Sequence, residues 1–334
     1  NDSSAKKDLS IVYTPLFGSG RDFVLDALEK DGFSQVHLVK KQAGFDGKFP
    51  GLRKPNPEEP EVFRIAEREA LRENADLMIA TDPDSDRIGA GVIQGSKAFF
   101  FTGNQIGALL ADFSRQGSVK GKIMVTTVVT GDLGSRIVTS RGATVIHTLT
   151  GSKFVCEEMN HMEAGEFLLG YEESHGYIGG MHIRDKDGVL AAMLLCETAA
   201  WQKTQGKTLL DALEDLYEEY GYYIDEQDSF VFEGAKGAKE MQKIMARLRS
   251  RRGSVFAPLG KPDKILDYEK GVDELPRSNV LKFFFPNGSW VAVRPSGTEP
   301  KIKFYYCIRG KDQRQAQELY EAVQTSVEEF LRSF

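Results

Sequence analysis

The chain carries the acidic stretch Thr81-Asp82-Pro83-Asp84-Ser85-Asp86-Arg87 directly after a short apolar run, Leu77-Met78-Ile79-Ala80. An apolar run of this length is typical of a buried strand. The acidic stretch therefore forms the loop that leaves the end of a strand, which is where α/β folds place their chemistry. We expect the rest of the fold to be organised around this loop.

The acidic loop has the composition of a metal site. Asp82, Asp84 and Asp86 occupy alternate positions, and alternate side chains of an extended segment lie on the same side. Pro83 disfavours a helix because the residue before a proline is pushed to extended geometry. Three like charges on one side repel unless a cation lies between them, and oxygen ligands suit Mg²⁺ or Mn²⁺. Arg87, a permanent cation, is suited to a phosphate group.

Three other interpretations of this loop agree with the sequence to different degrees. A calcium EF-hand loop that starts at Asp82 needs Gly and Glu where the chain has Arg87 and Ile93, which excludes it. A phosphatase of the haloacid-dehalogenase type has Asp-x-Asp followed two residues later by Thr or Val. Asp86 stands in that place, so the agreement is partial. A solvated acidic turn is the remaining alternative, since acidic turns are common.

Composition limits the class of protein. A chain of 334 residues predicts about two or three domains, and 41% hydrophobic with 28% charged residues is ordinary for a globular protein. A net charge of −6 argues against a nucleic acid partner. No apolar stretch is long enough to predict a membrane span, and no signal peptide pattern is found. Cys156, Cys196 and Cys307 have no metal spacing and indicate core thiols of a reducing compartment, so we expect a cytoplasmic protein.

The first half of the chain shows an α/β pattern that occurs twice. A strand over 11–14 leads through Gly18-Ser19-Gly20 into a helix, and this turn is either a tight turn or an anion site. After a polar linker near residue 117, strands and helices alternate again up to Thr150-Gly151-Ser152-Lys153, which opens a further helix. A glycine turn with lysine at a helix start can receive a phosphate, although a surface lysine explains it equally well.

Two later loops have the composition of ligand-binding segments. The apolar run Phe167-Leu168-Leu169 leads into Gly170-Tyr171-Glu172-Glu173-Ser174, whose carboxylates and hydroxyl can read sugar hydroxyls. A predicted hairpin around Asn287-Gly288 ends in the loop Arg294-Pro295-Ser296-Gly297-Thr298. A bidentate arginine, two hydroxyls and a glycine backbone form a suitable phosphate cradle, with a plain hairpin loop as the alternative.

In this order the three loops resemble the phosphoglucomutase/phosphomannomutase family, the α-D-phosphohexomutases. The matching motifs are Thr-Asp-Pro-Asp-Ser-Asp-Arg (81–87), Gly-Tyr-Glu-Glu-Ser (170–174) and Arg-Pro-Ser-Gly-Thr-Glu-Pro-Lys (294–301). The resemblance implies an α/β protein with two related mixed-sheet domains followed by a small α+β C-terminal domain. We expect boundaries at 6–116, 117–235 and 236–334. The family's Ser-His-Asn segment is not found, so we expect its N-terminal phosphoserine domain to be missing from this chain.

The resemblance also implies a role for each matching residue. Arg87 would lie beside the transferred phosphoryl group, and Lys153 would assist proton transfer or bind phosphate. The three aspartates, Asp82, Asp84 and Asp86, would hold one Mg²⁺. Glu172 and Ser174 would hold sugar hydroxyls. The clamp on the non-reacting phosphate would consist of Arg294, Ser296, Gly297 and Thr298. The role of His175 stays open, because Gly176 stands where some members have a histidine.

The implied activity is the interconversion of hexose 1-phosphate and hexose 6-phosphate, with glucose as the first choice of sugar. It would run through a phosphoserine and a bisphosphate intermediate, with glucose 1,6-bisphosphate as activator. The expected partner is a phosphosugar, with no nucleic acid and no membrane, in a monomer or homodimer. We expect the chain by itself to be inactive. The alternatives are a phosphosugar-binding module without turnover and a Mg²⁺-dependent phosphatase with Asp82 as nucleophile. The choice among glucose, mannose and pentose phosphates stays open.

Overall fold

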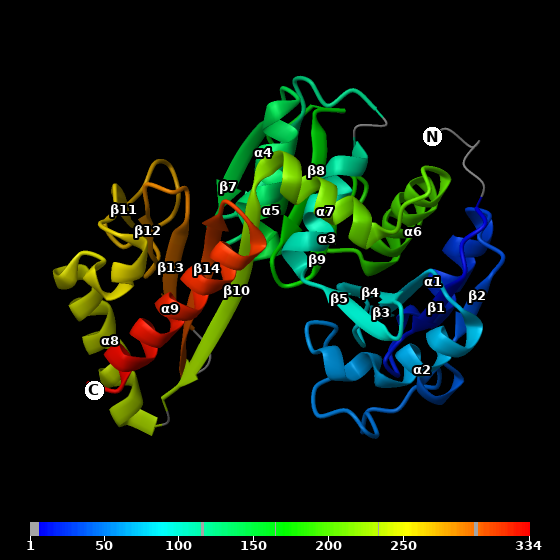
Figure 1. Cartoon of the computed structure of the whole chain (residues 1–334), viewed down its shortest axis with the longest axis horizontal. Coiled ribbons are helices and arrows are strands. Elements are labelled where there is room, and N and C mark those ends of the chain that lie inside the picture. Colours follow the sequence, from blue (N-terminus) through cyan, green and yellow to red (C-terminus); the bar gives the residue numbers. More distant parts are fainter. Residues whose placement is uncertain (1–6, 115–116, 164, 233, 297–299) are drawn as a thin grey trace. The chain divides into compact units, whose positions relative to one another are not determined.

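The structure is a computed structural model that describes residues 7–114, 117–163, 165–232, 234–296 and 300–334. It divides into two compact units, residues 1–216 and 217–334. The first unit contains two mixed sheets with helices, and the second contains one antiparallel sheet (Figure 1). The expectation of two related mixed sheets followed by a smaller α+β part is confirmed.

The first sheet carries the acidic loop. Strand β1 runs parallel to β2 and β3, whereas β4 and β5 are antiparallel to their neighbours. The acidic loop follows β3, so it leaves the sheet at the point where the strand direction reverses. In sheet order the strands are β2 (Val36–Leu38), β1 (Ile11–Thr14), β3 (Leu77–Thr81), β4 (Ile88–Gln94) and β5 (Lys97–Phe101).

Helices cover this first sheet because alternate strand residues are apolar on both faces. Met78 and Ala80 of β3 pack in a core with Ala66 and Ala70 of helix α2. Helix α6 packs against α1 and against strands β3 and β4. Every residue of β3 is consequently buried. The helical elements are α1 (Gly20–Lys30), η1 (Lys40–Gln42), η2 (Pro60–Phe63), α2 (Arg64–Glu73) and α6 (Gly188–Thr204).

The second sheet has the same plan and carries the Glu-Glu-Ser loop. Strand β6 is parallel to both β7 and β8, and β9 is antiparallel to β8. The loop of interest again follows a parallel strand and precedes an antiparallel one. The strands in sheet order are β7 (Thr144–Thr148), β6 (Ile123–Thr127), β8 (Phe167–Glu172) and β9 (Gly176–Ile178). Four helices complete this part of the chain: α3 (Gly103–Phe113), α4 (Asp132–Ser140), α5 (Ser152–Met159) and α7 (Leu209–Tyr220).

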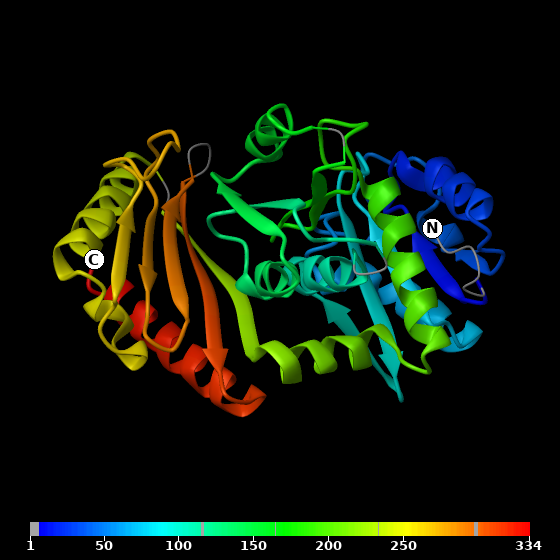
Figure 2. The same cartoon turned by 90° about the horizontal axis from the view of Figure 1, so that it is seen from above.

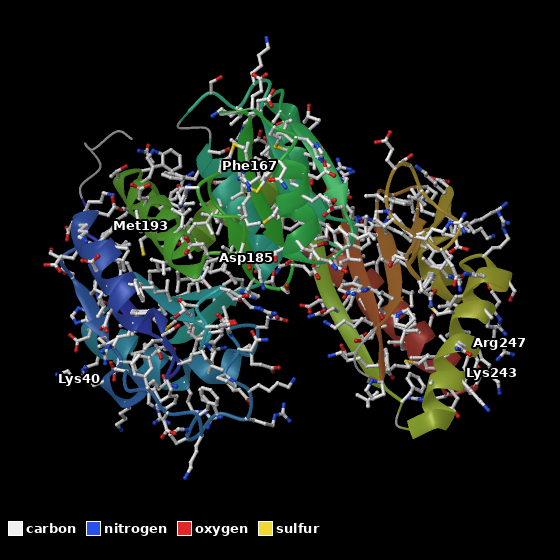
Figure 3. The ribbon with its side chains drawn as sticks, turned by 180° about the vertical axis from the view of Figure 1, so that it is seen from behind. Lys40, Phe167, Asp185, Met193, Lys243 and Arg247 are labelled. Atoms are coloured by element: carbon white, nitrogen blue, oxygen red, sulfur yellow. The ribbon has the colours of Figure 1, made fainter. Side chains whose placement is uncertain are left out.

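The second unit is an antiparallel sheet with two long helices (Figure 2). Helices α8 (Gly234–Arg251) and α9 (Gln313–Leu331) share one apolar core with the sheet and with η4 (Ser254–Leu259). Lys243 and Arg247 project from α8 on the side away from this core (Figure 3). The strand order is β10 (Tyr222–Val231), β14 (Lys301–Gly310), β13 (Trp290–Pro295), β12 (Leu281–Phe284) and β11 (Lys264–Asp267).

Strand β10 is longer than the sequence indicates and belongs to the last sheet. The sequence predicts a strand only over 229–232. In the structure all of β10 pairs with β14, from Tyr222 opposite Gly310 to Val231 opposite Lys301. Its half-buried, partly charged residues carry little of the alternation by which strands are recognised in sequences.

The three cysteines are buried and free of disulfides, as expected for core thiols. Burial raises the pKa of the Cys156 and Cys196 thiols above the ordinary value, which keeps them protonated. Among the helices that the structure describes, none combines the length and the apolar character required to cross a membrane.

Candidate active site

The acidic loop brings its three carboxylates together through a tight turn. The N–H of Ser85 donates to the carbonyl oxygen of Asp82 at 3.0 Å, and Ser85 has a left-handed backbone with φ of 60°. One carboxylate oxygen each of Asp82, Asp84 and Asp86 lies within 4.8 Å of the others. The sequence predicted the same convergence from an extended segment. The predicted cluster is present, but the turn at Ser85 produces it.

The turn Gly18-Ser19-Gly20 packs against the acidic loop and hydrogen-bonds to it. Ser19 donates to the carbonyl oxygen of Pro83 through its N–H at 2.8 Å and through its hydroxyl at 3.0 Å. A Cβ atom on Gly20 would lie 2.3 Å from Oγ of Ser85, so a larger residue would displace the loop. These contacts favour the tight-turn interpretation of this segment over an anion site.

Two cations face the acidic cluster. The N–H of Arg87 donates to Oδ1 of Asp82 at 2.9 Å, while its guanidinium forms an ion pair with Glu58. Nε of Arg87 lies 3.8 Å from Asp82 and 3.6 Å from Asp86. Nζ of Lys186 lies 2.6 Å from Oδ2 of Asp86. The loop therefore concentrates negative charge that basic side chains balance only in part.

The electrostatics of Asp82 favour a cation. Its side chain is buried, and this burial, together with the charges of Asp86 and Asp84, raises the pKa of Asp82 to about 7. The N–H of Arg87 acts in the opposite direction. A bound divalent cation would relieve both the desolvation and the repulsion. The oxygen-only donor set at this spacing fits Mg²⁺ or Mn²⁺.

The Glu-Glu-Ser loop turns its carboxylates toward neutral donors. Oε1 of Glu172 accepts the N–H of Gly151 at 2.7 Å, which ties the end of β8 to the turn before α5. Oε2 of Glu173 accepts the hydroxyls of Thr127 at 3.4 Å and Thr130 at 3.3 Å. Ser174 is half-buried. Lys153 stands exposed in the first turn of α5, just after the turn that Glu172 holds.

The two loops of the first unit meet at His175. The N–H of Ile88 donates to the carbonyl oxygen of His175 at 3.1 Å, and Arg87 bridges to Gly176. Nδ1 of His175 lies 3.1 Å from the carbonyl oxygen of Ile88, which only accepts, so Nδ1 carries a proton. His175 has a φ of 65°, and its burial lowers the pKa of the ring. These contacts indicate that His175 has a structural role, because it joins the acidic loop to the Glu-Glu-Ser loop.

The third predicted loop lies in the second unit. Arg294 is half-buried near the end of β13, opposite Lys303 of β14. The N–H of Ser296 donates to the carbonyl oxygen of Lys301 at 2.8 Å, which closes the described base of the loop. The remaining two predicted residues, Gly297 and Thr298, lie outside the described residues.

Sequence reasoning missed Glu58 and Lys186, both of which contact the acidic cluster or its arginine. Glu58 lies in a long loop rich in Gly and Pro, where its N–H donates to Oδ1 of Asn56 at 3.0 Å. Lys186 lies two residues before Gly188, the first residue of α6. Each is far from residues 82–87 along the chain and belongs to no motif, so only the folded contacts identify them.

The fold and the cluster define an α/β protein with a candidate divalent-metal site at the end of a strand. Family models agree over most of the chain. The models described as phosphoglucomutase/phosphomannomutase alpha/beta/alpha domain II, alpha/beta/alpha domain III and C-terminal domain match residues 1–95, 102–220 and 231–326. The chain belongs to the phosphoglucomutase/phosphomannomutase family.

Curated relatives carry the name phosphoglucomutase. The one from Staphylococcus haemolyticus is 35% identical over 334 residues, covering 95% of this chain and 61% of the relative. One from Staphylococcus aureus is 34% identical over 319 residues, covering 91% of this chain and 57% of the relative. This chain thus spans about three fifths of the length of these relatives.

Solved structures of similar fold come from distant members. Parafusin, a phosphoglucomutase from Paramecium, has a TM-score of 0.71 at 22% identity, covering 97% of this chain and 57% of that one. A putative phosphomannomutase from Thermus thermophilus has a TM-score of 0.66 at 20% identity, covering 96% and 62%. At these identities the likeness supports the fold.

Proposed function

We propose that this chain provides the metal, sugar and phosphate sites of a phosphohexomutase that interconverts hexose 1-phosphate and hexose 6-phosphate, with glucose as the preferred sugar. One observation carries the proposal. The acidic loop and the Glu-Glu-Ser loop come from two separate sheets, yet they are joined backbone to backbone through Arg87–Gly176 and Ile88–His175. A junction of this kind brings a metal site and hydroxyl-binding groups into one neighbourhood.

The metal site would use the three carboxylates, Asp82, Asp84 and Asp86. When bound, Mg²⁺ neutralises charge on a phosphoryl group in transfer. Around that site the protein's own residues have distinct tasks. The guanidinium of Arg87 would face the phosphoryl oxygens and stabilise the charge that develops on them. Its backbone N–H meanwhile holds Asp82 in place.

The sugar and the second phosphate would be held by other groups. Ser174 and Glu172 would hydrogen-bond sugar hydroxyls, and the contact of Glu172 with Gly151 would keep its carboxylate oriented. Lys153, at the start of α5, would bind phosphate or assist proton transfer. The non-reacting phosphate would be held by Arg294, Ser296, Gly297 and Thr298.

The phosphoryl donor in this proposal is a phosphoserine on a segment outside this chain. The free hydroxyl of the sugar phosphate attacks the phosphorus of the phosphoserine, the P–O bond to serine breaks, and the proton of the attacking hydroxyl passes to the serine oxygen, so that glucose 1,6-bisphosphate and a free serine form. The bisphosphate turns over in the site, and the other phosphoryl group returns to the serine. Two separate recognition loops fit this scheme, because each end of the sugar must be accepted in turn.

Calorimetric titration of the chain with glucose 1-phosphate and mannose 1-phosphate in the presence of Mg²⁺ tests the proposal. We expect binding of glucose 1-phosphate that Arg294→Ala abolishes and that the matched control Arg314→Ala, an exposed arginine of α9, retains. Binding that Arg294→Ala leaves unchanged would refute the phosphate clamp. Release of inorganic phosphate by the chain alone would favour the phosphatase alternative.

A further inference from the structure

Lys186 makes a contact that the proposed phosphoryl chemistry does not use. Its ammonium lies 2.6 Å from Oδ2 of Asp86, and its side chain is only 14% exposed. Lys203, another lysine of the first unit, forms a similar ion pair with Asp76 at 2.8 Å but is 44% exposed. Ion pairs of exposed lysines contribute little, whereas removing one partner of a pair shielded from water leaves an uncompensated charge and is costly.

The backbone around Lys186 is anchored on strand β9 and on the acidic loop. The N–H of Asp187 donates to the carbonyl oxygen of Tyr177 in β9 at 2.9 Å, and the N–H of Gly188 donates to the carbonyl oxygen of Ser85 at 3.0 Å. On its other side, Oδ1 of Asp185 accepts the N–H of Lys186 at 2.8 Å. The segment that carries the ammonium is thus fastened to the loop whose carboxylate it meets.

The aliphatic part of Lys186 runs through a slot that exists because residue 176 is glycine. A Cβ atom on Gly176 would lie 2.3 Å from Cδ and 2.9 Å from Cγ of Lys186. The same Cβ would stay 3.7 Å from Oε2 of Glu172, an ordinary contact distance. The lysine is the group that a side chain at 176 would displace.

From these contacts we infer that Lys186 is a built-in counter-cation of the acidic loop, which competes with the divalent metal for Asp86. The inference rests on the metal site of the proposed function. Arg87 is less suited to this task, because its guanidinium pairs with Glu58 and its Nε stays 3.6 Å from Asp86. Without metal, the ammonium offsets the repulsion among three carboxylates. A divalent ion that binds Asp86 must either displace this ammonium or bind more weakly because the ammonium repels it.

Two opposite effects follow from one residue. Lys186 stabilises the metal-free fold because it supplies positive charge to the carboxylates. It weakens metal binding for the same reason, since a tethered cation and a bound cation share the carboxylate of Asp86. Coupling of this kind is reciprocal, so metal binding loosens Lys186 as much as Lys186 opposes the metal.

Titration of the 334-residue chain with Mn²⁺, followed by the loss of the free-ion electron paramagnetic resonance signal, tests the inference. Relative to wild type, Lys186→Met should bind Mn²⁺ about fivefold more tightly or better, the lower end of typical coupling between two sites. Its metal-free form should unfold at a lower temperature, and Mg²⁺ should raise that temperature by more than in wild type. The matched control Lys203→Met should leave Mn²⁺ affinity unchanged.

The outcomes separate this inference from the proposed function. Tight Mn²⁺ binding by wild type with equal or weaker binding by Lys186→Met would refute the counter-cation while the metal site stands. Absence of Mn²⁺ binding in both proteins would refute the metal site itself and, with it, the competition. Binding by Lys186→Met that is stronger than in wild type supports both.

Gly176→Ala provides a second route to the same lysine without removing its charge. The added methyl group should push Lys186 out of its slot and raise Mn²⁺ affinity in the wild-type background. In the Lys186→Ala background the slot is free, so the same substitution should have no further effect. An equal gain in both backgrounds would show that Gly176 acts independently of Lys186 and would overturn the slot argument.

Discussion

The acidic loop and the Glu-Glu-Ser loop share a scaffold but differ in how their carboxylates are satisfied. Each follows a parallel strand of a mixed sheet, and each contains a non-glycine residue with positive φ, Ser85 or His175. Glu172 and Glu173 accept hydrogen bonds from neutral N–H and hydroxyl donors. The aspartates of the acidic loop instead face one another and two cations. The same architecture thus carries one loop whose carboxylates accept hydrogen bonds from neutral donors and one whose clustered carboxylates favour an added cation.

The largest expected effect comes from removing a carboxylate of the acidic loop. Asp84 is exposed, so Asp84→Ala should leave the fold intact while it removes one of three candidate ligands. We expect Mn²⁺ affinity of the chain to fall by about 100-fold, since even outer-shell partners of a metal can cost that much. Electron paramagnetic resonance titration measures the loss. Asp215→Ala, an exposed aspartate paired with Lys207, should have no effect, and equal Mn²⁺ binding by Asp84→Ala would remove this loop as the metal site.

The junction between the two loops predicts a smaller effect that depends on pH. His175→Asn keeps a residue that tolerates positive φ but loses the buried ring contact with Ile88. At pH 7 the variant should be less stable by about 1–3 kcal/mol, the cost of a lost buried hydrogen bond. Chemical denaturation of both proteins across pH 5 to 8 measures the difference.

The sign of the pH dependence follows from the lowered pKa of His175. In the unfolded chain this histidine binds a proton below about pH 6.5, whereas burial keeps it neutral in the fold to lower pH. The unfolded state then binds more protons, so acidification below that value destabilises the wild type through this residue. The His175→Asn variant lacks this titrating group, so its stability does not fall with pH for this reason. The difference in unfolding free energy between wild type and variant should therefore narrow as the pH falls from 7 to 5. A gap that stays constant would contradict a buried neutral ring, and the exposed His161→Asn serves as control.

The sequence predicted the fold well because its strand and turn signals are local. The buried run before Asp82 forms β3, and the Asn287-Gly288 turn joins β12 and β13 as expected. The motif residues of the acidic loop do converge. The residues that contact these motifs could not be predicted from the sequence. Lys186, for example, lies 100 positions after Asp86, yet its side chain passes Gly176 and forms an ion pair with that carboxylate. Pairings of that kind depend on how two sheets are joined, which periodicity does not encode.

The smallest effect on stability and Mn²⁺ affinity is expected from Glu58→Gln. This substitution tests the arginine of the acidic loop, because Glu58 is the ion-pair partner of Arg87. The Arg87 and Glu58 side chains are 28% and 21% exposed, so losing the pair's charge should cost only about 1 kcal/mol of stability. Once released, the guanidinium would move toward Asp82 and Asp86, because it already lies within 4 Å of both. Mn²⁺ affinity should therefore weaken by a few fold, opposite in sign to Lys186→Met. Glu59→Gln, which disrupts the neighbouring pair with Lys54, should leave affinity unchanged. If Glu58→Gln strengthened Mn²⁺ binding, Glu58 would not be what keeps Arg87 away from the carboxylates.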